Sequence, residues 1–227
     1  DGSDPRLPKG GVSPTALTYP GPLTLNANAR VVARANNPAH KNLTGSGNPP
    51  ISSTWSGSAA ATYVVETPPL VITEIMYHPP QPPTGNTNDA DNFEYLELKN
   101  VGTQSFSLVG VRLSGGVDYT FTASSGVTSL ASGETVLVVK NRAAFSSRYP
   151  AASNIAGEYL GNLDNGGDHL ALEGPLKEPV LDFRYENQWY PITDGHGYSL
   201  VIVDDHAPLS SWSNAASWRP SAELNGS

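Results

Sequence analysis

Five acidic residues are the side chains of this sequence best suited to hold a metal ion. Asp89, Asp91 and Glu94 lie close together in a segment that also carries Gly and Asn, and Glu74 and Glu97 lie on two extended runs expected to be neighbouring strands. Calcium binds hard oxygen ligands in flexible loops, so calcium is the metal that this set would take. The set lacks EF-hand spacing, and acidic loops are commonly only solvated, so unoccupied surface acids are the alternative.

The same acids are poorly arranged for sugar hydrolysis. A glycosidase holds two carboxylates at a defined separation across a cleft. Glu94 and Glu97 are three residues apart in an expected strand, and side chains with that spacing point to opposite faces. We expect Glu97 to be exposed beside Tyr95 and Lys99, and Glu94 to lie near the start of the strand within reach of water.

The sequence also lacks the signatures of other common catalytic centres. The GxSxG signature of a serine nucleophile is absent, and there is no cysteine to form a disulfide or a thiolate metal site. The five histidines follow no zinc-binding spacing. They are His40, His78, His169, His196 and His206. We therefore expect no enzyme here and no cofactor other than possible calcium.

Two adjacent aromatic residues are candidates for carbohydrate binding. Trp189 and Tyr190 follow each other in a polar loop, and a flat exposed aromatic ring can stack on a sugar. The other tryptophans have a structural interpretation. Trp212 and Trp218 would pin the C-terminal tail to a β-sandwich, and Trp55 would close a core in the first part of the chain.

The net charge of −8 is distributed unevenly along the 227 residues. Residues 1–66 hold five Lys or Arg against three Asp or Glu, a net +2, and residues 67–227 hold eight against eighteen, a net −10. An acidic surface repels nucleic acid and anionic lipid, so we expect neither as a partner. Cations and cationic surfaces are the more plausible partners. No apolar run is long enough to span a bilayer, and no signal peptide is visible.

These side chains are expected to lie on an all-β framework of two domains, residues 1–66 and 67–227. The 22 glycines and 20 prolines fall between short apolar runs, which favours many turns and few helices. A stiff joint at residues 66–69, with paired prolines, separates the domains. One short helix is expected at residues 141–149, with Asn141 as its cap.

Alternating apolar and polar residues predict the strands. In the first domain they are expected at residues 16–19, 29–35 and 60–65, with an exposed polar loop at 36–50. In the second domain they are expected at residues 70–77, 93–99, 108–114, 117–122, 134–140, 168–173, 179–184 and 198–203.

The first domain resembles the chitobiase or β-hexosaminidase C-terminal type of β-sandwich module. The motifs that carry this resemblance are DGSDPR at 1–6, YPGPL at 19–23, VVARA at 31–35, WS at 55–56 and ATY at 61–63. In that family a pair of strands precedes the DGSDP turn, and here it is missing. The resemblance therefore implies an N-terminally incomplete module.

The second domain resembles the bacterial lamin tail domain. Its motifs occur in order: EIM at 74–76, EYLELKN at 94–100, LVGVRL at 108–113, YTF at 119–121, LASGETV at 130–136 and NGGDHL at 165–170, with WRPS at 218–221 and NGS at 225–227 resembling the closing segment. The resemblance implies an immunoglobulin-like sandwich that acts as a non-catalytic binding or accessory module. It carries over no catalytic residues.

These observations lead to two alternative functions. The first is a non-catalytic structural, adhesion or targeting segment of a larger secreted or cell-surface bacterial protein. Its partners would be a protein or polysaccharide at the cell surface or in the matrix, or a second copy of the chain. The second is a calcium-dependent carbohydrate-binding accessory region of a secreted enzyme.

Overall fold

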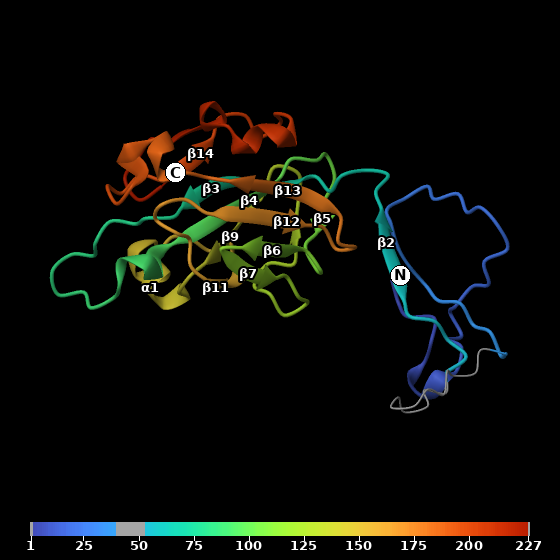
Figure 1. The fold of residues 1–227 in the computed structure, drawn as a ribbon. Coiled ribbons are helices and arrows are strands. Elements are labelled where there is room, and N and C mark those ends of the chain that lie inside the picture. Colours follow the sequence, from blue (N-terminus) through green and yellow to red (C-terminus); the bar gives the residue numbers. More distant parts are fainter. Residues whose placement is uncertain (1, 40–52, 227) are drawn as a thin grey trace, which may run out of the picture. The chain divides into compact units, whose positions relative to one another are not determined.

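The computed structural model describes residues 2–39 and 53–226, which form two compact units, Asp1–Glu66 and Thr67–Ser227 (Figure 1). Each unit is described here by itself. Most of the regular structure is β-strand, and among the described residues a single α-helix is present. The predicted all-β class with one short helix is confirmed.

Unit 1 contains one antiparallel pair of strands within its described residues, β1 (Ala29–Ala33) and β2 (Ala59–Tyr63). A short 3-10 turn, η1 (Pro8–Gly10), precedes them. The indole of Trp55 is 8% exposed and donates its Nε1–H to the carbonyl oxygen of Gly10 over 2.7 Å. Trp55 therefore holds the N-terminal loop. It is the one buried hydrophobic side chain among the described residues of unit 1, so the expected core around it is not seen there.

One expected strand of unit 1 is wrong. Residues 16–19 are not part of a strand, and Pro14 and Pro20 flank them. Proline lacks a backbone N–H and fixes its own φ, so Pro14 and Pro20 limit how far a ladder could extend beyond this short run. The predicted loop at 36–50 falls in its larger part, with His40, outside the described residues.

Unit 2 is a sandwich of two sheets (Figure 1). Within residues 67–226 the first sheet has six strands, in the spatial order β10 (Ile155–Glu158), β9 (Thr135–Val139), β4 (Tyr95–Asn100), β3 (Leu70–Met76), β14 (Leu200–Ile202) and β15 (Trp218–Pro220). All neighbours in this sheet are antiparallel except β10 and β9, which are parallel.

The second sheet of the same range has five strands, in the order β11 (Leu160–Gly161), β7 (Val117–Thr120), β6 (Arg112–Gly115), β12 (His169–Glu173) and β13 (Pro179–Arg184). A separate short pair joins β5 (Phe106–Ser107) to β8 (Ser129–Leu130). Turns of 3-10 helix complete the unit: η2 (Ala90–Phe93), η3 (Asn187–Trp189), η4 (Pro191–Thr193), η5 (Leu209–Ser213) and η6 (Ala215–Ser217).

The main core lies between the two sheets. Ile72 and Leu96 of the first sheet pack in one buried cluster with Leu113, Leu170 and Phe183 of the second. The tail joins this core, because Trp212 is fully buried and donates its indole N–H to the carbonyl oxygen of Ile72 over 2.9 Å. Both sheets and the tail pack around this one cluster. The cluster therefore fixes where the outer face of each sheet lies.

Helix α1 (Arg142–Arg148) covers a second, smaller cluster on the outer face of the first sheet. Asn141 caps it as expected, accepting the Ala144 N–H over 2.9 Å. Phe145 packs there beside Tyr95, and its ring stacks on Tyr149 with 4.4 Å between centroids. No helix among the described residues has the length and apolar character that crossing a membrane requires.

Candidate functional site

The outer face of strands β3 and β4 gathers most of the polar chemistry of unit 2. Leu96 and Leu98 of β4 point into the main core, so the alternate residues Tyr95, Glu97 and Lys99 lie on the opposite face. A register shift between Ile72 and Glu74 leaves Thr73 as an extra residue in β3. The shift places Glu74 directly opposite Glu97 on this outer face.

Glu74 is buried, with 3% of its surface exposed, and is held by hydroxyl groups. Its Oε1 accepts hydrogen bonds from the Tyr95 hydroxyl over 2.6 Å and from Ser199 Oγ over 2.5 Å. Burial raises the pKa of Tyr95 well above its usual value, and the neighbouring Glu74 charge raises it further. Tyr95 therefore stays protonated and acts as a hydrogen-bond donor to Glu74.

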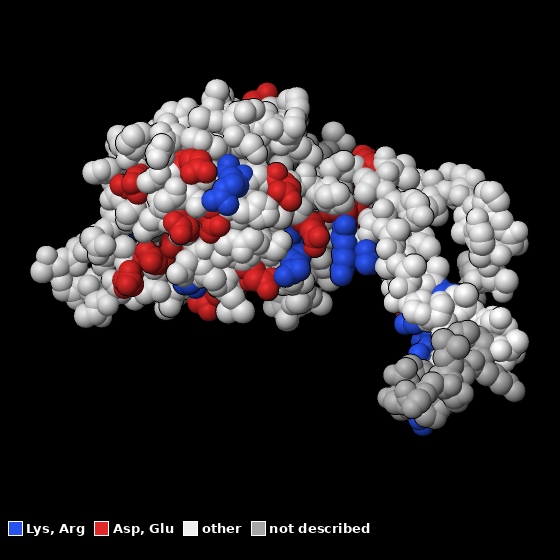
Figure 2. Space-filling view, in the orientation of Figure 1, with Lys and Arg blue, Asp and Glu red and all other residues white. Residues whose placement is uncertain are grey.

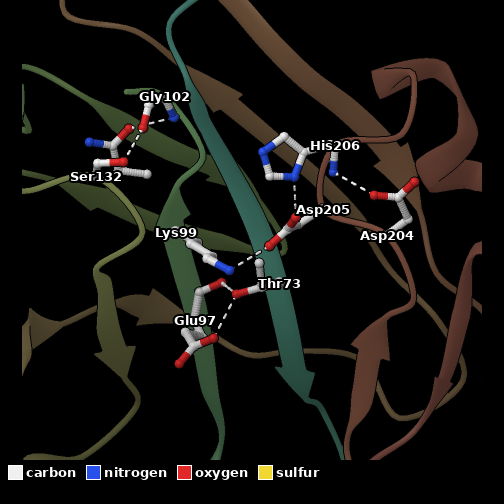
Figure 3. A network of polar contacts seen from close by, with 9 residues as sticks. Thr73, Glu97, Lys99, Gly102, Ser132, Asp204, Asp205 and His206 are labelled. Carbon is white, nitrogen blue, oxygen red and sulfur yellow. Dashed lines mark hydrogen bonds and ion pairs between the residues drawn. The ribbon is translucent and has the colours of Figure 1, made fainter. Parts of the chain in front are cut away.

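Glu97 is only partly buried, and one of its oxygens is engaged. Thr73 donates its hydroxyl to Oε1 of Glu97 over 2.7 Å. In Figure 3 the second carboxylate oxygen points away from Thr73. Among the described residues, that oxygen has no hydrogen-bond or ion-pair partner. Glu97 was expected to be exposed beside Tyr95 and Lys99, but it is half-buried.

A charged network continues along β4 toward the turn after β14 (Figure 3). Lys99 Nζ lies 2.6 Å from Oδ2 of Asp205, whose Oδ1 is 2.6 Å from Nδ1 of His206. Asp204 accepts the backbone N–H of His206 over 2.9 Å. Burial raises the pKa of Asp205, but hydrogen bonds from Lys99 and His206 outweigh that effect and lower it.

Asp204, Asp205 and His206 form the one group among the described residues that brings three potential metal ligands within 4.8 Å of one another. Sequence reasoning missed this group. An Asp-Asp-His run was the available signal, although a run of neighbouring polar residues is usually a solvated turn. Both oxygens of Asp205 are already engaged by Lys99 and His206, so the group is a self-satisfied turn.

The five acidic residues proposed as calcium ligands are not gathered into one group. Asp89 caps η2, accepting the Asp91 N–H over 3.2 Å, which is a local structural role. Glu74 and Glu97 meet each other on the outer face of the sheet.

Glu94 is separate from the outer face, and the expectation that water reaches it is wrong. Its side chain is fully buried, and its Oε2 accepts the Tyr159 hydroxyl over 2.7 Å and the Leu163 N–H over 3.0 Å. Its Oε1 has no partner among the described residues. Burial raises the pKa of Glu94 to about 7, against the lowering effect of the two hydrogen bonds and of Lys140. The η2 turn, which sequence periodicity did not show, buries the start of β4.

Trp189 and Tyr190 are half-buried, which corrects their assignment as exposed aromatics. Trp189 packs on the main core, with its ring centroid 6.5 Å from that of Trp218. The Tyr190 hydroxyl donates to the carbonyl oxygen of Ala215 over 3.2 Å. Both rings therefore contact the tail, Trp189 at Trp218 and Tyr190 at Ala215, and each has only part of its surface free for a ligand.

A cleft of about 460 Å³ opens on the outer face, beside the Glu74 and Glu97 pair. Its walls come from the sheet, from α1 and from the C-terminal tail. Its lining residues are Glu74, Tyr95, Glu97, Leu137, Phe145, Arg148, Tyr149, Ala152, Asn154, Leu224, Asn225 and Gly226. Gly226, with φ of +107°, lies so close that a Cβ would fall 1.9 Å from the Tyr95 hydroxyl.

The α1 wall of this cleft contains two buried polar groups that make no hydrogen bond of good geometry to the described residues. They are Nη1 of Arg148 and Oη of Tyr149, and the Arg148 and Tyr149 side chains are neighbours that interact electrostatically. The Arg148 guanidinium lies 3.6 Å from the Phe93 ring centroid, and its Nη2 donates to the carbonyl oxygen of Pro80 over 3.1 Å. Burial raises the pKa of Tyr149 to about 12, against the lowering effect of the neighbouring Arg148 guanidinium, so its hydroxyl stays protonated. Arg148 and Tyr149 were not identified from the sequence.

Taken together, the geometry defines an immunoglobulin-like β-sandwich whose polar residues mostly stabilise its outer face. Residues 64–185 match the family model of the Lamin Tail Domain, which is more than half of the chain, so the chain belongs to the lamin tail domain family. That family is an immunoglobulin-like, non-catalytic domain family. Comparisons with curated proteins and with solved structures found no match.

Proposed function

We propose that this chain is a non-catalytic structural, adhesion or targeting segment of a larger secreted or cell-surface bacterial protein. It holds or positions a partner, which is a protein or polysaccharide at the cell surface or in the matrix. The observation in favour is the way in which the acidic side chains are used. Glu74, Glu94 and Asp205 each accept hydrogen bonds that fix the sandwich. Groups used in this way stabilise a scaffold.

The first unit has a different part in this proposal. The resemblance of residues 1–66 to a chitobiase C-terminal type module supports a second binding or spacer domain. Apolar side chains of this unit are strongly exposed, including Leu17 at 90% and Tyr19 at 71%. Exposed apolar side chains favour association with another surface, which fits an extracellular assembly of several copies.

Surface proteolysis of intact cells of the producing bacterium tests the proposed location. Brief protease treatment should release peptides of this chain into the medium, while peptides of a cytoplasmic marker protein should remain with the cells. Peptides of this chain that appear only after cell lysis would contradict the proposal. In parallel, the purified chain should show no turnover of broad glycoside, ester and peptide substrates.

Calcium-dependent carbohydrate binding in a secreted enzyme is the second candidate. The observation in favour is the surplus of ten acidic over basic side chains in residues 67–227, which attracts divalent cations. Figure 2 shows acidic side chains spread over the visible face of this unit, with fewer basic ones between them. Binding of a glycan only in the presence of calcium would favour this candidate over the first.

A further inference from the structure

The outer cleft is a feature of unit 2 that the scaffold role does not use. Its floor carries Glu74 and Glu97, which are paired directly across β3 and β4. Like charges at directly opposite positions of an antiparallel pair repel each other. Hydroxyl donors compensate part of this charge, but Glu97 has no basic partner among the described residues. A cation placed between the two carboxylates would remove the repulsion.

The walls favour an organic cation over a bare metal ion. Tyr95, Phe145 and Tyr149 form a cluster of aromatic rings at the α1 side, with centroids 4.4–5.8 Å apart. Aromatic rings and alkyl side chains accommodate the methylene stem of a long basic side chain, and aromatic faces attract its charge. A metal ion would instead need several oxygen ligands, and among the described residues no group of three His, Asp or Glu side chains meets in this cleft.

Two hydrogen-bond donors in the cleft wall indicate that the cationic group belongs to a peptide. Arg148 Nη1 and Tyr149 Oη, on the α1 wall of the cleft, are both hydrogen-bond donors. They need an acceptor, which a ligand that carries only a cationic group does not supply. A free amine offers them no good acceptor, whereas the backbone carbonyl of a peptide does. A buried donor without a partner is costly, so an acceptor that reaches it is bound favourably.

We propose that the cleft binds a Lys or Arg side chain of a partner polypeptide. The basic head lies between Glu97 and Glu74, the alkyl stem lies along the aromatic wall, and a backbone carbonyl of the partner accepts from Arg148 or Tyr149. The net charge of −10 on residues 67–227 attracts such a partner over a longer range. This inference rests on the proposed binding role and specifies the chemistry of the partner.

The test uses the whole chain and a capped tripeptide, acetyl-Ala-Lys-Ala-amide. Backbone amide resonances of the ¹⁵N-labelled protein are followed during titration. We expect saturable shifts at Glu97, Tyr149 and Asn154, with a dissociation constant on the order of 1 mM. The same peptide with norleucine in place of Lys is the matched ligand, and it should give no saturable shift, because it keeps the stem and lacks the charge.

Glu97→Gln should weaken binding by about tenfold, because it removes one charge-assisted hydrogen bond. Glu173→Gln on β12, in the other sheet, should leave the affinity unchanged. The same spectra report whether each variant is folded. Equal shifts with the norleucine peptide, unchanged affinity of the Glu97 variant, or saturation by a neutral disaccharide alone would overturn the inference. Those results would leave the surface location untouched, because proteolysis of intact cells measures it separately.

Discussion

The Tyr95 hydroxyl donates a 2.6 Å hydrogen bond to the buried Oε1 of Glu74, one strand away. This bond lies beneath Gly226 of the tail and beside the outer cleft. It therefore links three parts of unit 2: the sheet, the tail and the candidate binding surface. Its removal should affect stability more than an average hydrogen bond, because the acceptor is a buried carboxylate.

Tyr95→Phe should lower the free energy of unfolding by about 2 kcal/mol, within the 1–3 kcal/mol typical of a buried acceptor that loses a donor. Urea unfolding with an unchanged slope measures this loss. Tyr119→Phe is the matched control, because its hydroxyl donates to Ser125 at a partly buried site. Equal losses in the two variants would show that the Glu74 bond has no special weight.

Glu94 should make the protein less stable as the pH rises. Its pKa is raised from 4.5 to about 7 in the folded state, so the folded state holds the proton more tightly. The stabilisation is fully present below pH 4.5 and is lost as the pH rises through 7. A shift of this size corresponds to about 3 kcal/mol.

Glu94→Gln, which has no proton to lose, should flatten this dependence between pH 5 and about 7.5. The readout is the urea midpoint measured at intervals across that range. Lys140 and Asp91 also act on the carboxyl group, so Asp91→Asn is the control and should retain most of the slope. An unchanged slope in the Glu94 variant would assign the dependence to other groups.

Trp212→Phe should lower the free energy of unfolding by about 2–4 kcal/mol. The smaller ring leaves a cavity, and the variant loses the indole N–H that donates to the Ile72 carbonyl oxygen. Thermal unfolding should shift downward in one step with the rest of unit 2. A tail that melts separately at low temperature in the native protein would show that Trp212 does not anchor it to the core.

The calcium-dependent alternative has its own consequence for stability. A ligand that binds only the folded state raises the melting temperature by mass action. That alternative therefore predicts a higher melting temperature in millimolar calcium than in chelator, and a smaller difference for Asp89→Asn combined with Asp91→Asn. Superimposable melting curves in calcium and in chelator would eliminate it.

Self-association is predicted to depend on unit 1. Exposed apolar side chains lie at the end of β2 and just after it, Tyr63 at 51% and Val65 at 56%. Strand edges with such neighbours are templates for pairing with another copy. Light scattering should show larger species for residues 1–227 than for residues 67–227, which contain their own core. A monomeric long form would refute this idea.

The sequence determined the class of fold and most long strands of unit 2. The extended apolar run at residues 70–77 and the largely alternating run at 179–184 match β3 and β13, because both patterns are typical of strands. The cap at Asn141 and the stacked pair of Phe145 and Tyr149 were also predictable, because they depend on residues within one helical turn. Five short strands were missed because their two to four residues carry no usable period. They are β5, β8, β10, β11 and β15. Strands β6, β7 and β14 are as short but fall within longer extended runs that the sequence shows.

Only the tertiary structure decided which acids meet. Sequence proximity grouped Asp89, Asp91 and Glu94, but the η2 turn directs Asp89 to its cap and buries Glu94. The extra residue at Thr73 shifts the register and brings Glu74 opposite Glu97, two residues 23 positions apart in the printed sequence. A single inserted residue reverses which face every following side chain occupies, and no local pattern announces it. The cleft exists because sheet, helix and tail converge there, and such convergence is a property of long-range packing.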